Sequence, residues 1–212
     1  MRCLIATQKL DDKDKQVGIF FDRNRLRQEY TPIVMHFTQT ELKGSFLVEL
    51  EPIIDDRGDF SRTYCAREFQ AAGLNTHWVQ HNLSRNHGMG TLRGLHYQCA
   101  PFEEIKLVRC TKGAIFDVIV DLRPESPTYC RWEGFELTDR NGRTLYIPEG
   151  FAHGFQTLAD TSEVFYLMSA FYHPECARGV RWDDPAFGIR WPETNERILS
   201  PKDCRYPDLM AR

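Results

Sequence analysis

The sequence lacks the long apolar segments that membrane-spanning and exported proteins carry. Across its 212 residues, no apolar run approaches the roughly 18 residues that a membrane-spanning helix needs. The first residues also lack the apolar core of a signal peptide, because their apolar stretch extends only from Cys3 to Ala6. We therefore expect a cytoplasmic protein without a membrane partner.

Cysteine is present, but its spacing indicates neither a disulfide framework nor a zinc site. The seven cysteines are odd in number, and no two of them form a CxxC pair. Such scattered cysteines are typical of free thiols in a reducing compartment. They are Cys3, Cys65, Cys99, Cys110, Cys130, Cys176 and Cys204.

The sequence has no excess of positive charge and no glycine-rich phosphate loop. Lys and Arg number 27 against 30 for Asp and Glu, which gives a net charge of −3 and argues against a nucleic-acid partner. The missing loop at a strand-to-helix junction argues against P-loop and Rossmann nucleotide sites. Hydrophobic residues make up 42% and charged residues 27%, a globular composition that excludes extensive disorder.

Two regions differ in composition, and we place their boundary at residue 44. Dividing the length by about 150 residues per domain predicts either one large domain or one domain with an appendage. Residues 1–44 contain the polar segment DDKDKQ and form an expected N-terminal extension of uncertain order, to which we assign no function. The alternative is an extra strand or helix packed on the domain, and Met35 is a second possible start. Residues 45–212 form the expected main domain.

The main domain has the pattern of an all-β protein. Short segments rich in β-branched and aromatic residues alternate with turn residues, which predicts an antiparallel β-sandwich or barrel. Asn141-Gly142 between two alternating segments predicts a two-residue hairpin. One short helix is expected over Arg67–Gly73, with Gly73 at its end. The expected strands include 46–53, 76–84, 105–113, 114–122 and 163–172.

Two segments resemble the paired motifs of the cupin superfamily, which has a jelly-roll fold. The segment GTLRGLHYQ (90–98) carries His96, and YIPEGFAHGFQ (146–156) carries His153. Metal cupins hold their ion with several converging His and Glu ligands. Position 98 shares a strand face with His96 but is Gln rather than His, and the second motif ends in Gln156. We therefore expect the jelly roll without a metal, while a metal-dependent cupin enzyme stays open as an alternative.

The chain then resembles a specific family, the dTDP-4-dehydrorhamnose 3,5-epimerases and related epimerases of nucleoside-diphospho-4-keto-6-deoxyhexoses. The resemblance follows the family order from Phe46 to the C-terminus. It implies a homodimeric cupin-type β-sandwich with few short helices that uses no cofactor. The implied activity is inversion of C3 and C5 of dTDP-4-dehydro-6-deoxy-D-glucose, a step of dTDP-rhamnose and polysaccharide biosynthesis. The matching segments are DDRGDF (55–60), VQHNLS (79–84), GTLRGLHYQ (90–98), residues 105–129, LYIPEGFAHGFQTL (145–158), WDDP (182–185), IRWP (189–192) and LSPKD (199–203).

The implied reaction needs three chemical groups around the sugar. A base removes a proton next to the C4 ketone, a cation or donor stabilises the enolate oxygen, and an acid returns a proton from the opposite face. The resemblance implies His96 as the base and Asp203 as the carboxylate paired with it. It likewise implies Lys106 as the cation facing the C4 oxygen and Tyr166 as the acid.

The resemblance also implies residues that bind the substrate. Guanidinium groups match phosphate oxygens, and Arg57 and Arg93 are expected at the diphosphate. Gln80 and Asn82 lie two positions apart, hence on one strand face, and are expected to contact the sugar or a phosphate. Tyr172 is expected to stack on the nucleotide base.

A further expected pair lies beside the base. Asp117 interrupts an apolar strand, and a buried carboxylate there needs a hydrogen-bond partner. The resemblance points to the imidazole of His153 as that partner.

Two departures from the family pattern leave the substrate open. Arg62 stands where many members carry Glu, and Glu103-Glu104 stands where Gln is often found. Both positions are expected near the ligand. The alternatives are a single-centre epimerase, acting at C3 or C5 of another dTDP- or CDP-linked sugar, and a non-catalytic module that binds sugar nucleotides.

Overall fold

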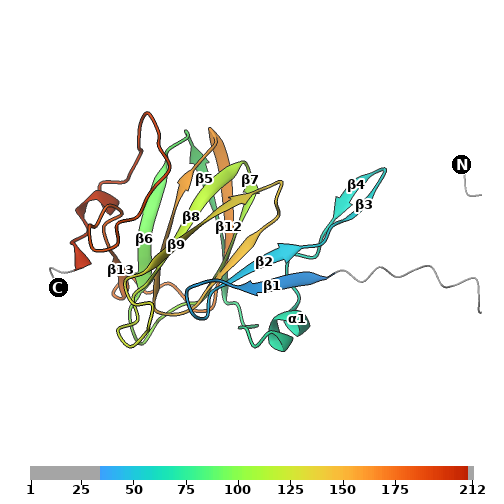
Figure 1. The fold of residues 1–212 in the computed structure, drawn as a ribbon, viewed down its shortest axis with the longest axis horizontal. Helices are drawn as coiled ribbons and strands as arrows, with labels where there is room; N and C mark the ends of the chain where they lie inside the picture. The colour runs from blue at the N-terminus through green and yellow to red at the C-terminus, as the bar shows by residue number, and fades with distance from the viewer. Residues whose placement is uncertain (1–33, 210–212) are drawn as a thin grey trace, which may run out of the picture. The chain divides into compact units, whose positions relative to one another are not determined.

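The computed structural model describes residues 34–209, which form two antiparallel β-sheets packed face to face (Figure 1). The predicted β-sandwich is thereby confirmed. The first sheet is six-stranded, in the order β1-β2-β10-β7-β12-β5. Its strands are β1 (Met35–Gln39), β2 (Phe46–Leu50), β10 (Thr144–Ile147), β7 (Lys106–Lys112), β12 (Thr161–Met168) and β5 (Gln80–His87).

The second sheet is five-stranded, in the order β13-β6-β11-β8-β9. Strands that follow one another along the chain mostly alternate between the two sheets, so one segment such as 92–112 contributes side chains to both walls of the space between them. The strands of this sheet are β13 (Ala177–Gly179), β6 (Leu92–Gln98), β11 (Phe151–Thr157), β8 (Ala114–Asp121) and β9 (Trp132–Thr138).

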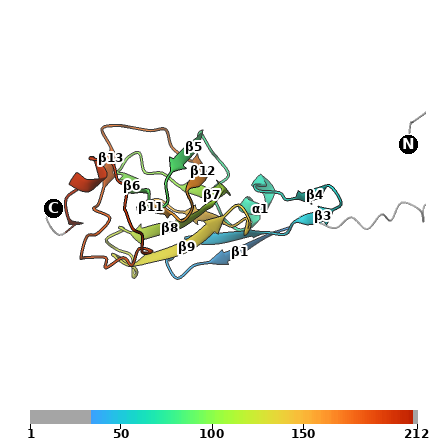
Figure 2. The same ribbon diagram turned by 90° about the horizontal axis from the view of Figure 1, so that it is seen from above.

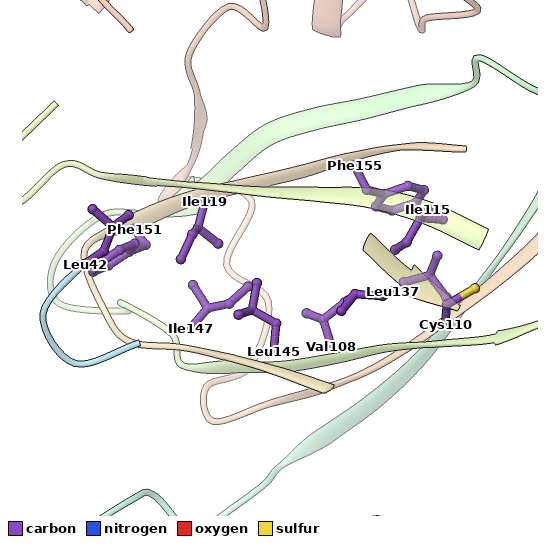
Figure 3. Packing of buried hydrophobic residues seen from close by; sticks show 11 residues of the cluster. Leu42, Val108, Cys110, Ile115, Ile119, Leu137, Leu145, Ile147, Phe151 and Phe155 are labelled. Atoms are coloured by element: carbon purple, nitrogen blue, oxygen red, sulfur yellow. The ribbon is translucent and has the colours of Figure 1, made fainter. Parts of the chain in front are cut away.

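The main core occupies part of the space between the two sheets (Figure 3). Side chains alternate between the two faces of a strand. On β8, Ile115 and Ile119 therefore enter this core, whereas Val118 and Val120 pack on the opposite face of the sheet. The buried members of the core are Leu42, Val108, Cys110, Ile115, Ile119, Leu137, Leu145, Ile147, Phe151, Phe155 and Val164.

The helix α1 (Ala66–Ala71) covers part of the outer face of the six-stranded sheet. Phe69 is fully buried there, and burying a side chain of this size contributes about 1.5–3 kcal/mol. Gly73 ends the helix as expected: it has a φ of +72°, and the N–H groups of Gly73 and Leu74 donate to the carbonyls of Gln70 and Phe69.

The C-terminal segment covers the outer face of the five-stranded sheet and then runs along β6. Phe187 and Val180 pack with Leu95 in a third apolar cluster. The backbone of Ile198 then donates to Gly90 and accepts from Leu92, which fixes the segment beside β6. A 3-10 turn, η1 (Asp203–Arg205), follows. In both ribbon views, this segment lies at the same side of the sandwich as β6 and β13 (Figures 1 and 2).

The short hairpin of β3 (Ile53–Asp55) and β4 (Gly58–Phe60) extends away from the sandwich (Figures 1 and 2). All six residues of its strands are exposed. Ile54 is 75% exposed and Phe60 is 63% exposed, so among residues 34–209 the hairpin presents apolar surface to solvent.

Two expectations from the sequence differ from the structure. Asn141-Gly142 does not form a two-residue hairpin, because the strands before and after it, β9 and β10, belong to different sheets. The Asn141 side chain instead accepts from the backbone of Thr138 and Arg143 and turns the chain toward the other sheet. The expected extension reached residue 44, yet β1 pairs along its whole length with β2. The described part of that segment therefore belongs to the sandwich, and residues 1–33 lie outside the described residues.

Candidate active site

A pocket of about 780 Å³ lies between the two sheets. The six-stranded sheet lines it with residues of β5, β7 and β12, and the five-stranded sheet with residues of β6 and β11; the C-terminal segment contributes as well. Nine of the eleven expected site residues line this pocket: Gln80, Asn82, Arg93, His96, Lys106, His153, Tyr166, Tyr172 and Asp203.

His96 and Asp203 form a close pair in the pocket wall. His96 Nε2 lies 2.7 Å from Asp203 Oδ1, and the two residues are 107 positions apart in sequence. The His96 side chain is 44% exposed, whereas that of Asp203 is 5% exposed. Burial acts to raise the pKa of Asp203, but hydrogen bonds from His96, Ser200 and the Gly94 backbone outweigh it and lower that pKa. Asp203 therefore stays ionised and holds the imidazole, whose Nδ1 is the nitrogen able to accept a proton.

A glycine gives the C-terminal segment room to reach His96. The Tyr206 ring lies against Gly179 on β13, where a Cβ would come within 2.4 Å of Tyr206 Cζ. The same ring lies 5.8 Å from the His96 ring, between centroids, in an edge-on arrangement. The pocket is also lined by three residues that were not predicted from the sequence: Arg178, Lys202 and Tyr206. Lys202 adjoins Asp203 in the LSPKD segment, which was the available signal; Arg178 and Tyr206 lie in none of the matching segments.

Lys106 lies on the opposite wall and is paired with a carboxylate. Its Nζ is 2.7 Å from Glu104 Oε1 and 3.4 Å from the His96 carbonyl oxygen. The two charged side chains are only 8% and 7% exposed. The Lys106 ammonium is therefore a fixed charge at the pocket wall.

Tyr166 faces the pocket from β12, next to Lys106. It is opposite Val108 on β7, and Lys106 is two positions from Val108, so the two functional side chains share one face of the sheet. Burial raises the pKa of Tyr166; Arg93 acts to lower it, and the negative charge of Glu104 adds to the increase. Tyr166 is therefore a neutral phenol that can donate a proton.

His153 and Asp117 form a second, more deeply buried pair. His153 lies directly opposite His96, on β11, and its Nε2 is 2.8 Å from Asp117 Oδ1. Its side chain is 10% exposed, and Asp117 is fully buried behind it. This pair supports the wall beside His96 and presents little surface to a ligand.

Polar side chains continue the pocket wall on β5 and at the end of β6. Gln80 and Asn82 line the pocket together, and Gln80 also accepts from the Tyr172 backbone N–H. Gln98 donates to the carbonyls of Phe102 and Phe171 and accepts from His173 N–H, so its amide connects two loops. Within residues 34–209, no group of three or more His, Cys, Asp or Glu side chains could hold a metal ion.

Two arginines expected near the ligand lie outside this pocket. Arg57 is at the turn of the β3–β4 hairpin, where its guanidinium pairs with Asp55 and is 89% exposed. Arg62 Nη1 lies 3.0 Å from Glu68 Oε1 on α1. Neither arginine is among the residues that line the pocket between the sheets.

Comparison with known proteins identifies the family. The sequence profile of a family described as dTDP-4-dehydrorhamnose 3,5-epimerase matches residues 39–211. The chain belongs to this family. The dTDP-4-dehydrorhamnose 3,5-epimerase of Sinorhizobium fredii is 43% identical over 175 residues, 82% of this chain and 90% of that protein. The protein of the same name from Methanothermobacter thermautotrophicus is 45% identical over 82% of this chain and 94% of its own length.

Solved structures of the family share the fold. The dTDP-4-dehydrorhamnose 3,5-epimerase of Bacillus anthracis, solved with TDP and PPi bound, has a TM-score of 0.80 at 40% identity and covers 83% of this chain and 100% of that one. A 3'-monoepimerase from Streptomyces bikiniensis, solved with dTDP-quinovose, has a TM-score of 0.74 at 34% identity, with coverage of 81% and 86%. The chain is therefore an isomerase of the epimerase class. No helix within residues 34–209 has the length and apolar character to cross a membrane.

Proposed function

We propose that this epimerase inverts C3 and C5 of dTDP-4-dehydro-6-deoxy-D-glucose to give dTDP-4-dehydro-L-rhamnose. His96 takes the proton next to the C4 ketone, Lys106 stabilises the enolate oxygen, and Tyr166 returns a proton from the other side. Loss of a proton from C3 and from C5 generates an enolate on the same C4 oxygen, so one Lys106 serves both centres. The chemistry needs no cofactor, because the ketone already acidifies both C–H bonds.

One observation carries this proposal: the base and the acid belong to opposite walls of one pocket. His96 is on β6 of the five-stranded sheet, whereas Tyr166 and Lys106 are on β12 and β7 of the six-stranded sheet. A sugar held between the sheets would meet a base on one face and an acid on the other. Inversion at a carbon requires that geometry, because the proton leaves from one face and returns to the opposite one.

The remaining pocket residues support binding of a nucleoside-diphosphate sugar. Arg93 and Lys202 line the pocket and supply positive charge for phosphate oxygens. Tyr172, 59% exposed at the rim, has a free face on which a nucleobase can stack. Gln80 and Asn82 supply hydrogen-bonding groups for the sugar.

Solvent exchange tests the function directly. The enzyme is incubated with dTDP-4-keto-6-deoxyglucose in D₂O, and the sugar protons are followed by NMR. Deuterium is expected at both C3 and C5, and the partner reductase should then give a rhamnose-configured product. Exchange at one carbon alone, with saturating substrate, would establish a single-centre enzyme, and no exchange at either carbon would contradict epimerase activity on this sugar. The CDP-linked sugar serves as the comparison for nucleotide preference.

The assembly and the location belong to the same proposal. A homodimer is supported by the exposed apolar side chains of the β3–β4 hairpin, since such surfaces mark interaction sites. If Arg57 binds the diphosphate, as the family resemblance implies, it reaches the pocket of a second copy, because it does not line its own pocket and its hairpin extends away from the sandwich (Figure 1). A cytoplasmic location is supported by the six described cysteines, which are all free thiols.

A further inference from the structure

Three carboxylates lie at or behind the pocket wall, and each forms a close pair with one basic side chain. Asp203 holds His96 and Asp117 holds His153, at 2.7 and 2.8 Å. The third, Glu104, lies 2.7 Å from Lys106 Nζ. The first two pairs orient imidazoles, whereas Glu104 places a negative charge beside the cation that faces the enolate.

The Glu104 carboxylate has two opposite effects on the proposed reaction: it disfavours the negative enolate and stabilises the positive Lys106 ammonium. It repels the developing enolate, which makes the transition state less stable. However, the Lys106 ammonium has only 8% of its side chain exposed, and a buried ion needs a charged partner. The adjacent carboxylate supplies that partner and fixes the position of Nζ in the pocket wall.

Glu104 also acts on Tyr166. The Tyr166 phenol is partly buried, and this burial raises its pKa; Arg93 opposes the increase, and the charge of Glu104 adds to it. A negative charge near the phenol therefore preserves its proton. Loss of that charge would make Tyr166 lose its proton more readily.

We propose that Glu104 is a positioning residue that fixes the Lys106 ammonium through their ion pair and preserves the Tyr166 proton, and thereby sets the alkaline limit of epimerisation. This inference rests on the proposed function of the pocket. The other charged or titratable groups that line the same pocket are Arg93, His96 and Tyr97 from β6, His153 from β11, Arg178 from β13, and Tyr172, Lys202, Asp203 and Tyr206 from segments outside these strands. Asp203 is hydrogen-bonded to His96, whereas Glu104 is the carboxylate that directly contacts the Lys106 ammonium.

The test compares the isosteric variant Glu104→Gln with the wild type over a range of pH. Initial rates of deuterium incorporation should show the alkaline limb of kcat/KM moved to lower pH by about one unit or more, because loss of a nearby negative charge favours ionisation of the phenol. Near neutral pH, kcat should change by less than about tenfold, because the phenol still carries its proton there. Affinity for dTDP, measured by calorimetry, should stay within about twofold, because Glu104 contacts Lys106, the cation proposed to act on the sugar.

Matched variants separate a charge effect from a structural one. Glu103→Gln removes the neighbouring carboxylate, which lies outside the pocket, and should leave the profile unchanged. Glu104→Asp keeps the charge at shorter reach and should give a smaller shift in the same direction, and this variant decides the question if Glu104→Gln does not fold. An alkaline limb identical to the wild type in the folded Glu104 variants would overturn the proposal.

A second measurement does not depend on turnover. NMR titration of tyrosine labelled at Cζ, with Tyr166→Phe to assign the signal, should show that the phenol of Tyr166 titrates at lower pH in Glu104→Gln than in the wild type. An unchanged titration would contradict the role of Glu104 even if the substrate of the enzyme proved to be another sugar. A wild type inactive on the dTDP sugar, combined with the expected shift, would contradict only the proposed substrate.

Discussion

The two histidine–carboxylate pairs of the pocket differ in depth, and the difference separates their roles. His96 is 44% exposed and His153 is 10% exposed, although the two face each other across neighbouring strands. Only the more exposed ring has the surface to meet a substrate carbon. The buried Asp117–His153 pair instead fixes β8 against β11 behind it.

Replacement of His96 by Asn tests the base at the level of one side chain. The variant removes the imidazole but keeps a polar group of similar size, so folding and dTDP affinity should be retained. The rate should fall by about 10²–10⁴, the usual contribution of a general base. The measurement is turnover of the dTDP sugar, with circular dichroism to check the fold. The control is His87→Asn, which changes an exposed histidine outside the pocket and should keep full activity; turnover near wild type in His96→Asn would remove His96 from the mechanism.

The site residues could be predicted from the sequence only through the resemblance to a known family, not from local sequence patterns. His96 and Asp203 are 107 positions apart, and no local periodicity could bring them together. The resemblance named both, and the structure shows how the backbone of Ile198 and the space at Gly179 bring them into contact. Tyr206 escaped prediction, because its position depends on how the C-terminal segment crosses β13, which is a tertiary feature.

At the level of elements, local sequence patterns predicted where strands lie along the chain, but not which strands pair in a sheet. Alternating or β-branched segments such as 105–113 and 114–122 correspond to β7 and β8. Strand β11 is buried at all seven positions, so it has no alternation to detect. Asn141-Gly142 does mark a turn, but strand pairing is a long-range property, and the chain changes sheets there.

The turn after β8 depends on one carboxylate. Burial acts to raise the pKa of Asp121, but hydrogen bonds from Arg123, Ser126 and Thr128 outweigh it and lower that pKa to about 2. The Arg123 ion pair measures 2.7 Å, and the Asp121 side chain is fully buried. The network therefore stabilises the ionised, folded form of the turn.

Replacement of Asp121 by Asn should cost stability in a pH-dependent way. A fall from an ordinary pKa of about 3.9 to about 2 corresponds to roughly 2–3 kcal/mol at pH 7. Because the folded pKa is the lower one, this contribution is complete above about pH 4 and disappears as the pH falls toward 2. Urea unfolding should show wild type and variant converging over that range. Asp160→Asn, at an exposed carboxylate, should show no such difference, and a gap for Asp121→Asn that is constant with pH would contradict the ionic origin.

At the scale of the whole molecule, the hairpin and the pocket are separate parts of one chain that the proposed dimer would unite. The pocket lacks the guanidinium that the family resemblance expects from Arg57, and the hairpin that carries Arg57 leaves Ile54 and Phe60 mostly exposed. A symmetric dimer would bring a guanidinium to each pocket and cover the exposed hairpin, because an isologous interface places the same hairpin at each of the two sites.

Hybrid dimers test this arrangement. Chains with His96→Asn and chains with Arg57→Ala are each expected to be impaired. A hybrid of the two has one site with both defects and one site with neither, provided that Arg57 acts on the partner's pocket. Random mixing of equal amounts should then leave about a quarter of the sites intact, because half of the dimers are hybrids. Activity should recover to a similar fraction of the wild type.

The control mixture combines His96→Asn with Lys106→Gln. Both residues line the pocket of their own chain, so every site in this hybrid carries one defect and no recovery is expected. Native mass spectrometry verifies that hybrids form in each mixture. Recovery confined to the Arg57→Ala mixture would establish that the hairpin completes the second site. If hybrids form without recovery, or if Arg57→Ala alone is fully active, then the hairpin has no part in binding the diphosphate, and its exposed apolar residues serve assembly alone.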